Sequence, residues 1–258
     1  MLDQLFRLPF LTGLLLTVIV ALLGAYLRLR GEWMAALGLP HIAAAGGVAA
    51  VSLGLPLTLG AALTTASAAA IKSLLAGSGN SAFALMLILG WGAALTLSGH
   101  LAQGEVSAEE LLGGQIYFTT AAHLYAALAL AVACLLSLPW LNHRLLLQRF
   151  FPDHFRANRR PAWPHELLFA ALLVMAVVLA TVSLGALPAF ALFFVPPWVA
   201  FGLVRQWKQG LVLTVALALA AYLLAFLLAI LMDQPFGPTL TLLLALMAAL
   251  RWAVQRPL

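Results

Sequence analysis

NHRLLLQRFFPDHFRANRRPAWPHE, residues 142–166, is the longest polar interruption in a chain that is otherwise mostly apolar. It places five arginines between two long apolar runs: Arg144, Arg149, Arg156, Arg159 and Arg160. Short loops rich in lysine and arginine stay on the cytoplasmic side of a membrane. This loop therefore predicts the orientation of every other segment of the chain.

The middle of the loop is predicted to form a short helix. Phe150, Phe151 and Phe155 lie at helical spacing beside Asp153 and the arginines, a pattern typical of an amphipathic helix. Such a helix on the cytoplasmic face suits the docking of a soluble partner. The alternative is a solvated basic loop that has no partner. The residues expected in the docking contact are Phe151, Pro152, Asp153, Phe155 and Arg156.

Composition assigns the chain to the membrane. Of its 258 residues, 64% are hydrophobic and only 8% are charged, and the mean hydropathy is +1.07, far from the values of a soluble globular domain. The formal charge of +5 comes from basic residues in short loops, where membrane topology explains it, so nucleic acid is not an expected partner. The single cysteine, Cys134, excludes an internal disulfide and a cysteine-based metal site.

Apolar runs predict an all-α, polytopic membrane helix bundle of about 8–9 spans, because a helix needs about 20 apolar residues to cross the hydrocarbon core. The first run is too long for the core of a signal peptide, so it is expected to remain as a helix. The candidate spans are 9–29, 35–53, 56–74, 82–102, 119–140, 166–184, 186–204, 210–231 and 239–256.

The basic residues then set the topology. With the loop at 142–165 in the cytoplasm, the loops at 28–33, 72–81 and 205–209 share its side, together with the tail from Arg251. Only Arg7 of the 13 lysines and arginines falls outside, a bias that the inverted topology could not produce. The N-terminus is predicted outside the cell and the C-terminus in the cytoplasm.

The outer loops carry different signals. In the segment 103–115, Ser107 and Glu110 have the spacing of a capping box, which predicts a short helix at the membrane surface. The segment 233–238, DQPFGP, predicts a tight turn because it holds two prolines and a glycine. The alanine- and glycine-rich segment 43–70 predicts close helix packing through small residues.

One predicted span contains several prolines. Gly185, Pro188, Pro196 and Pro197 lie within GALPAFALFFVPPWVAFG, and proline removes a backbone donor and blocks the preceding turn. A broken helix at membrane depth is typical of transport pathways. The alternative is a kinked helix with only a packing role.

Few residues at membrane depth can ionise, and these are functional candidates. The histidines are His41, His100 and His123, and a neutral imidazole can bind zinc, manganese or iron. No metalloprotease helix, nucleophile elbow, phosphate-binding loop or pair of intramembrane carboxylates occurs in the sequence. These absences favour a transport conduit over an enzyme, with no cofactor and with energy supplied by another subunit.

The chain resembles the permease subunits of ABC importers for zinc, manganese and iron, which are related to the vitamin B12 and siderophore permeases. YLRLRGEWMAALGLPHIAAAGGVA is similar to a family stretch in which a basic pair precedes Gly-Asp-x-x-x-His and a small-residue helix, with His41 on the family histidine. FFPDHFRA resembles the family's Phe-Asp-Pro-Glu-x-Ala. LGALPAFALFFVPPWVA resembles Gly-Ala-Leu followed by Ile-Ile-Pro-Ala-Ala, and MDQPFGPTLTLLLAL resembles the Asp-x-Pro-x-Gly-Pro turn before the last helix.

The departures from the family pattern fall where cargo would be bound. The family aspartate four residues before the histidine is Leu37 here, and the Gly-Asp of an outer loop corresponds to Gly114-Gln115. The loss of a carboxylate weakens direct binding of a bare divalent ion. The family metal site is therefore carried over only at His41, and a metal held by a chelate tolerates this loss better.

The resemblance implies a type II ABC importer permease, a single transmembrane domain over residues 1–258 with a cytoplasmic coupling loop at 142–165. It implies a homodimer in a bacterial inner membrane, docked to two copies of a cytoplasmic ABC ATPase and supplied by a periplasmic or extracellular substrate-binding protein. The expected cargo is iron, delivered by a siderophore or other chelate, or zinc or manganese. The alternatives are a secondary transporter of a small solute and an intramembrane enzyme or scaffold.

Overall fold

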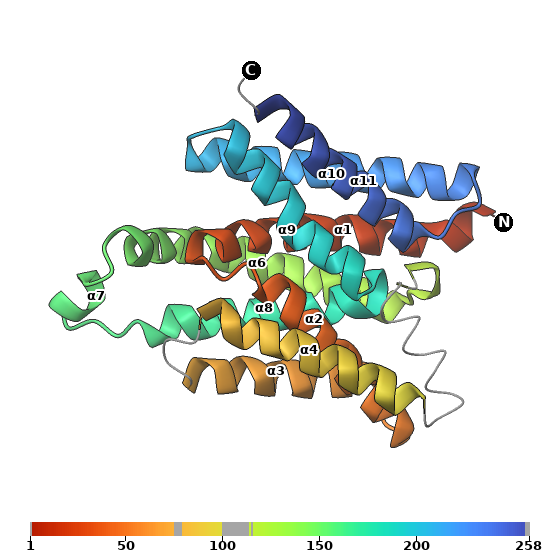
Figure 1. Ribbon diagram of the computed structural model, residues 1–258, viewed down its shortest axis with the longest axis horizontal. Coiled ribbons are helices and arrows are strands. Elements are labelled where there is room, and N and C mark those ends of the chain that lie inside the picture. The colour runs from red at the N-terminus through yellow and green to blue at the C-terminus, as the bar shows by residue number, and fades with distance from the viewer. Residues whose placement is uncertain (1, 75–78, 100–113, 115, 256–258) are drawn as a thin grey trace.

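Long helices lying side by side build the molecule (Figure 1). The computed structural model describes residues 2–74, 79–99, 114 and 116–255. The helices in chain order are α1 (Leu2–Arg30), α2 (Ala35–Ser52), α3 (Leu57–Leu74), α4 (Gly79–Ser98), the 3-10 turn η1 (Ile116–Phe118), α6 (Ala121–Phe150), α7 (His154–Ala157), α8 (Trp163–Leu184), α9 (Ala186–Leu203), α10 (Trp207–Leu231) and α11 (Phe236–Gln255).

The predicted all-α membrane bundle is confirmed. Eight helices of the described ranges are long and apolar enough to cross a membrane, and α3 is not among these eight. Each predicted run corresponds to one long helix, but α6 continues ten residues beyond its predicted end at 140 and stops at Phe150. The prediction ended the run where polar residues begin, whereas Leu146, Gln148 and Arg149 are strong helix formers that extend the helix.

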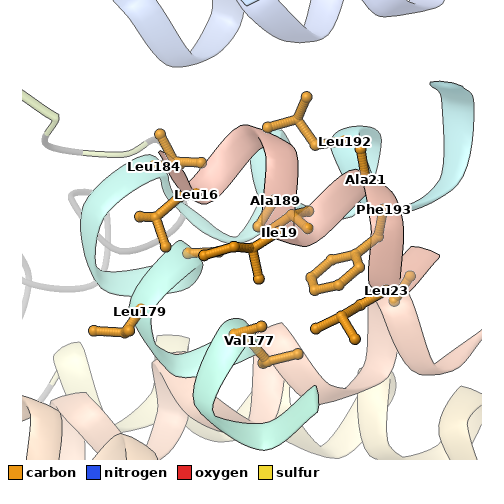
Figure 2. Packing of buried hydrophobic residues seen from close by; sticks show 14 of the residues in the cluster. Leu16, Ile19, Ala21, Leu23, Val177, Leu179, Leu184, Ala189, Leu192 and Phe193 are labelled. Atoms are coloured by element: carbon orange, nitrogen blue, oxygen red, sulfur yellow. The ribbon is translucent and has the colours of Figure 1, made fainter. Parts of the chain in front are cut away.

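Helix α1 lies at the centre of the core. Its Leu16, Ile19 and Leu23 face Val177 of α8 and Phe193 of α9 in the packed interior (Figure 2). All five side chains are buried. Since lipid tails are as apolar as leucine, helices in a membrane associate mainly through such close van der Waals packing.

The small residues of α2 and α3 allow those helices to approach closely, as predicted from their composition. A Cβ built at Gly60 would lie 2.2 Å from the backbone oxygen of Gly46. A Cβ at Gly38 would likewise lie 2.3 Å from the backbone oxygen of Phe83 in α4. No side chain fits at either contact, so these glycines set the distances between α2 and its two neighbours.

The loop between α1 and α2 is held by charge. Glu32 pairs with Arg30 at 2.9 Å, and Lys72 of α3 also donates to its carboxylate. Burial alone would raise the pKa of Glu32, but the hydrogen bonds and positive charges of Arg30 and Lys72 outweigh it and lower the pKa. Asn80 of α4 fastens the same loop through a bond of 2.9 Å to the oxygen of Gly31.

The prolines do not interrupt the helix of the proline-rich span. Helix α9 runs continuously from Ala186 to Leu203 with Pro196 and Pro197 inside it, and Pro188 lies in its first turn. The chain instead breaks before α9, at Gly185, whose φ of 97° and ψ of 159° separate α8 from α9. Glycine adopts this conformation without the clash that a Cβ would cause.

The two ends of the bundle differ. Helix α7 lies at one end, and the chain's N-terminus and the turn between α10 and α11 lie at the other (Figure 1). The predicted turn at 233–238 is only partly a turn, because α11 already begins at Phe236. The predicted surface helix with Ser107 and Glu110 lies outside the described residues, as does His100.

Candidate functional site

The predicted coupling loop, residues 142–165, contains a short helix, but this helix is smaller than the predicted one, because Phe150 ends α6 and Phe151 lies between α6 and α7. Helix α7 covers His154–Ala157 and includes Arg156. Phe151, Pro152 and Asp153 precede it, and all three are exposed, Phe151 by 63%. Adjacent exposed apolar residues, here Phe151 and Pro152, are typical of surfaces that contact another protein.

Phe155, within α7, is buried, in contrast to these three residues. It is only 5% exposed, and its ring lies 4.7 Å from the ring of His165, centroid to centroid. The guanidinium of Arg144 lies 5.9 Å from the centre of the Phe155 ring. Phe155 was expected to face the partner, but in this chain it attaches α7 to the ends of α6 and α8.

A chain of hydrogen bonds fixes His165 in turn. Its Nε2 donates to Oε1 of Gln148 at 3.1 Å, and Nε2 of Gln148 donates to Oε1 of Glu166 at 2.6 Å. His165 is buried, so these bonds satisfy a polar ring that would otherwise be costly to bury. Sequence reasoning did not single out His165, because only the folded loop brings it against Phe155.

The prolines of α9 lie against α1. Pro197 cannot donate to the backbone oxygen of Phe193, so that oxygen loses its usual helical partner. A Cβ at Gly24 of α1 would lie 2.0 Å from this oxygen. The absence of a side chain at Gly24 therefore lets α1 cover the exposed carbonyl, and a Cα–H group can give it a weak hydrogen bond.

A cavity of about 460 Å³ lies beside these prolines, between α1, α2 and α9. Pro197 lines it together with Arg28 and Trp33. Aromatic rings form a column along this side of α9, because Phe194 stacks on Phe190 at 5.7 Å and Trp198 lies 6.3 Å from Phe194. The predicted pathway helix thus borders a cavity, although the helix itself is not broken.

His41 lies buried in α2, only 5% exposed. Its Nδ1 lies 2.8 Å from the backbone oxygen of Leu37, which can only accept, so Nδ1 carries the proton and Nε2 keeps its lone pair. Leu37 stands where the permease family that the sequence resembles has a carboxylate, and it contributes its backbone oxygen to this bond. Among the described residues, no three His, Cys, Asp or Glu side chains gather to hold a metal ion.

His123, the second of the predicted intramembrane histidines within the described residues, caps a helix. The backbone N–H of Thr120 donates to its Nδ1 at 3.2 Å, and the Thr120 hydroxyl lies 2.9 Å from the same nitrogen. This reciprocal arrangement closes the N-terminus of α6 as a capping box. The geometry explains His123 without a bound ion.

Comparisons with known proteins agree with this architecture. A subunit in the solved structure of PsaBC from Streptococcus pneumoniae in complex with Fab is 19% identical, with a TM-score of 0.82 over 96% of this chain and 91% of that one. A metal-chelate type ABC transporter in an inward-facing conformation is also 19% identical, with a TM-score of 0.73 over 96% of this chain and 84% of that one. These likenesses establish the shared fold.

A search of the curated proteins returns no match. The sequence model of the ABC 3 transport family, however, matches residues 2–255, almost the whole chain. The match covers the predicted coupling loop, the proline-rich helix α9 and His41 together. The chain therefore belongs to the ABC 3 transport family and is a multi-pass membrane permease.

Proposed function

We propose that this permease imports a transition metal, with iron carried in a chelate as the cargo and free zinc or manganese as the alternative. The observation that carries this choice is the pair formed by His41 and Leu37. One imidazole nitrogen and no neighbouring carboxylate make a poor site for a bare ion. A chelate brings most of its metal's ligands with it and needs fewer from the protein.

A metal cargo is supported by one of the two similar structures. That structure is a metal-chelate type transporter by its description. Helix α9 would line the pathway with Pro196 and Pro197, beside the 460 Å³ cavity. The pathway would also include Gly185 and Pro188, where the chain turns from α8 into α9.

The proposed energy source is a separate cytoplasmic ABC ATPase. Its contact would be formed by the exposed residues Phe151, Pro152 and Asp153, with Arg156 of α7 beside them. Phe155 would act from behind by fixing α7 on the bundle. Motion of the ATPase would then reach α6 and α8 through the Phe155–His165 contact.

The proposed assembly contains two permeases, two ATPases and an outer substrate-binding protein. Closed two-fold symmetry is the commonest arrangement for an oligomer of identical subunits. Mass measurement of the complex purified in detergent should give two copies of each of the two subunits. A complex that transports cargo with one copy of each would contradict the dimer.

The proposed orientation puts α7 in the cytoplasm and the N-terminus outside. Cys134 is buried, so single cysteines at Arg160 and at Gln234 can be introduced without strong background labelling. In intact cells, a membrane-impermeant maleimide should label Gln234→Cys and reach Arg160→Cys only after the membrane is opened. The reverse pattern would invert the topology.

A further inference from the structure

A second cavity, of about 420 Å³, lies at the end of the bundle that carries α7. The ends of α1 and α6 and the connection between α9 and α10 form its walls. Three arginines line it, Arg28, Arg149 and Arg205. Three aromatic residues also line the cavity: Phe150, Phe201 and Trp207.

Among the described residues, no acidic side chain lines this cavity to balance its charge. The two ion pairs found within the described ranges join Glu32 to Arg30 and Lys72, and not to the arginines of the cavity. All three arginines are exposed. The preference of basic residues for the cytoplasmic side explains why they lie at this end, but it does not explain why they converge on one cavity. An anion would relieve their mutual repulsion.

The aromatic wall is held in place by neighbouring groups. Trp207 donates its Nε1–H to Oδ1 of Asn142 at 2.7 Å, and Tyr26 donates its hydroxyl to the same oxygen at 3.1 Å. Phe201 stacks on Trp207 at 4.9 Å and 28°. Gly210 leaves room for this stack, since a Cβ there would lie 2.2 Å from the Phe201 ring. The cavity is therefore preorganised before any ligand binds.

We propose that this cavity binds the phosphate group of an anionic phospholipid such as phosphatidylglycerol. Guanidinium groups bind phosphate oxygens with paired hydrogen bonds. The cavity lies at the ends of membrane-spanning helices, where aromatic side chains are suited to the headgroup region. Basic pockets between such helices bind the headgroups of anionic lipids. The proposal does not depend on which metal the permease carries.

Native mass spectrometry of the purified permease, alone and with its ATPase, tests the proposal. The protein is titrated with phosphatidylglycerol, with phosphatidylcholine and with inorganic phosphate. Wild type should bind one phosphatidylglycerol per permease at least about tenfold more tightly than phosphatidylcholine. The double variant Arg149→Gln/Arg205→Gln should lose this preference. The control Arg160→Gln removes one positive charge from an exposed arginine outside the cavity and should keep the preference.

Four results would overturn the proposal. They are equal binding of the two lipids by wild type, an equal loss in the Arg160→Gln control, displacement of the lipid by the ATPase, and occupation by inorganic phosphate as tight as by the lipid. The melting temperature in phosphatidylcholine checks that the double variant is folded. If the double variant is not folded, Arg205→Lys provides a second test, because it keeps the charge but loses the paired hydrogen bonds. This variant should show intermediate lipid retention. Unchanged retention would count against the site.

Discussion

The rings of Phe155 and His165 lie 4.7 Å apart, centroid to centroid, and tilted by 33°, so that helix α7 is attached to the first turn of α8. Phe151, four residues earlier, is largely exposed. The two phenylalanines of the coupling loop therefore have different tasks. In the proposed docking, Phe151 would offer a surface to the ATPase and Phe155 would hold that surface in position.

Phe151→Asp should release the ATPase during purification without lowering the melting temperature of the permease. The substitution places a charge in an apolar contact but removes no packing inside the chain. Met232→Asp is a matched control, because Met232 is also 63% exposed but lies at the opposite end of the bundle. Retention of the ATPase by Phe151→Asp, with transport intact, would refute the proposed docking surface.

Phe155→Ala should weaken ATPase binding indirectly. Removing a buried phenylalanine typically costs about 3 kcal/mol or more of packing, and here the loss falls on the attachment of α7. Hydrogen exchange should therefore become faster in α7 and at the start of α8, while the exchange of α1 and α9 stays unchanged. Phe151→Ala, made as the comparison, should leave exchange in α7 as it is. Equal exchange in the two variants would show that Phe155 does not hold the helix.

Gly24→Ala should destabilise the bundle. The added Cβ would lie 2.0 Å from the backbone oxygen of Phe193, so α1 and α9 must move apart. Overpacking of this kind costs about 1–3 kcal/mol, which thermal melting in detergent can detect. Gly92→Ala is the control, because nothing lies within 4 Å of a Cβ at that helical position, and it should be neutral or mildly stabilising. Equal melting temperatures for the two variants would exclude the close contact.

Glu32 should make stability depend on acidic pH. Its pKa is lowered from the ordinary value of 4.5, despite burial, by Arg30 and Lys72. A carboxylate with a lowered folded-state pKa stabilises fully above its unfolded pKa, and this contribution disappears as the pH falls through the lower folded value. The melting temperature of wild type should therefore fall below about pH 4.5, and that of Glu32→Gln should fall less. Parallel curves for both proteins would show that the ion pairs contribute nothing measurable.

The spans were predictable because their signal is strong and local. An apolar run of helical length must cross the membrane, and a short basic loop must remain inside, so α8 and α10 could be recognised without their neighbours. The course of α9 was not predictable in this way. Whether Pro196 and Pro197 break a helix depends on what covers the carbonyls they expose, and Gly24 of α1 is far away in the sequence.

In the predicted coupling loop, too, the sequence could not predict what depends on contacts with distant residues. The spacing of Phe150, Phe151 and Phe155 predicted one short helix, but only Phe155 lies in α7, because Phe150 ends α6 and Phe151 lies between the two helices. It could not indicate which ring turns inward, because that depends on His165 and Gln148 arriving from α8 and α6. The 420 Å³ cavity is similar, since Arg28, Arg149 and Arg205 each look like ordinary loop charges until the fold brings them together.

The identity of the cargo can be tested by substitutions in one turn of α2. Nδ1 of His41 is bonded to the backbone oxygen of Leu37, so only Nε2 remains for a metal. A stable site would need further ligands from a second permease, from water or from a chelator. Free zinc and manganese should therefore be taken up poorly, and chelated iron should be taken up well, in cells that lack other importers. Leu37→Asp adds a carboxylate one helical turn before His41, and it should increase uptake of the free ions.

His41→Ala separates the remaining possibilities. If the cargo passes His41 as a chelate, this variant should reduce iron uptake partly while the purified permease still melts at the wild-type temperature. His123→Ala is the control, because that imidazole only caps α6. Strong uptake of free zinc or manganese by wild type that disappears in His41→Ala would reject the chelate. Unchanged uptake of every cargo in His41→Ala would make His41 a packing residue of α2, with its hydrogen bond to Leu37 as its only role.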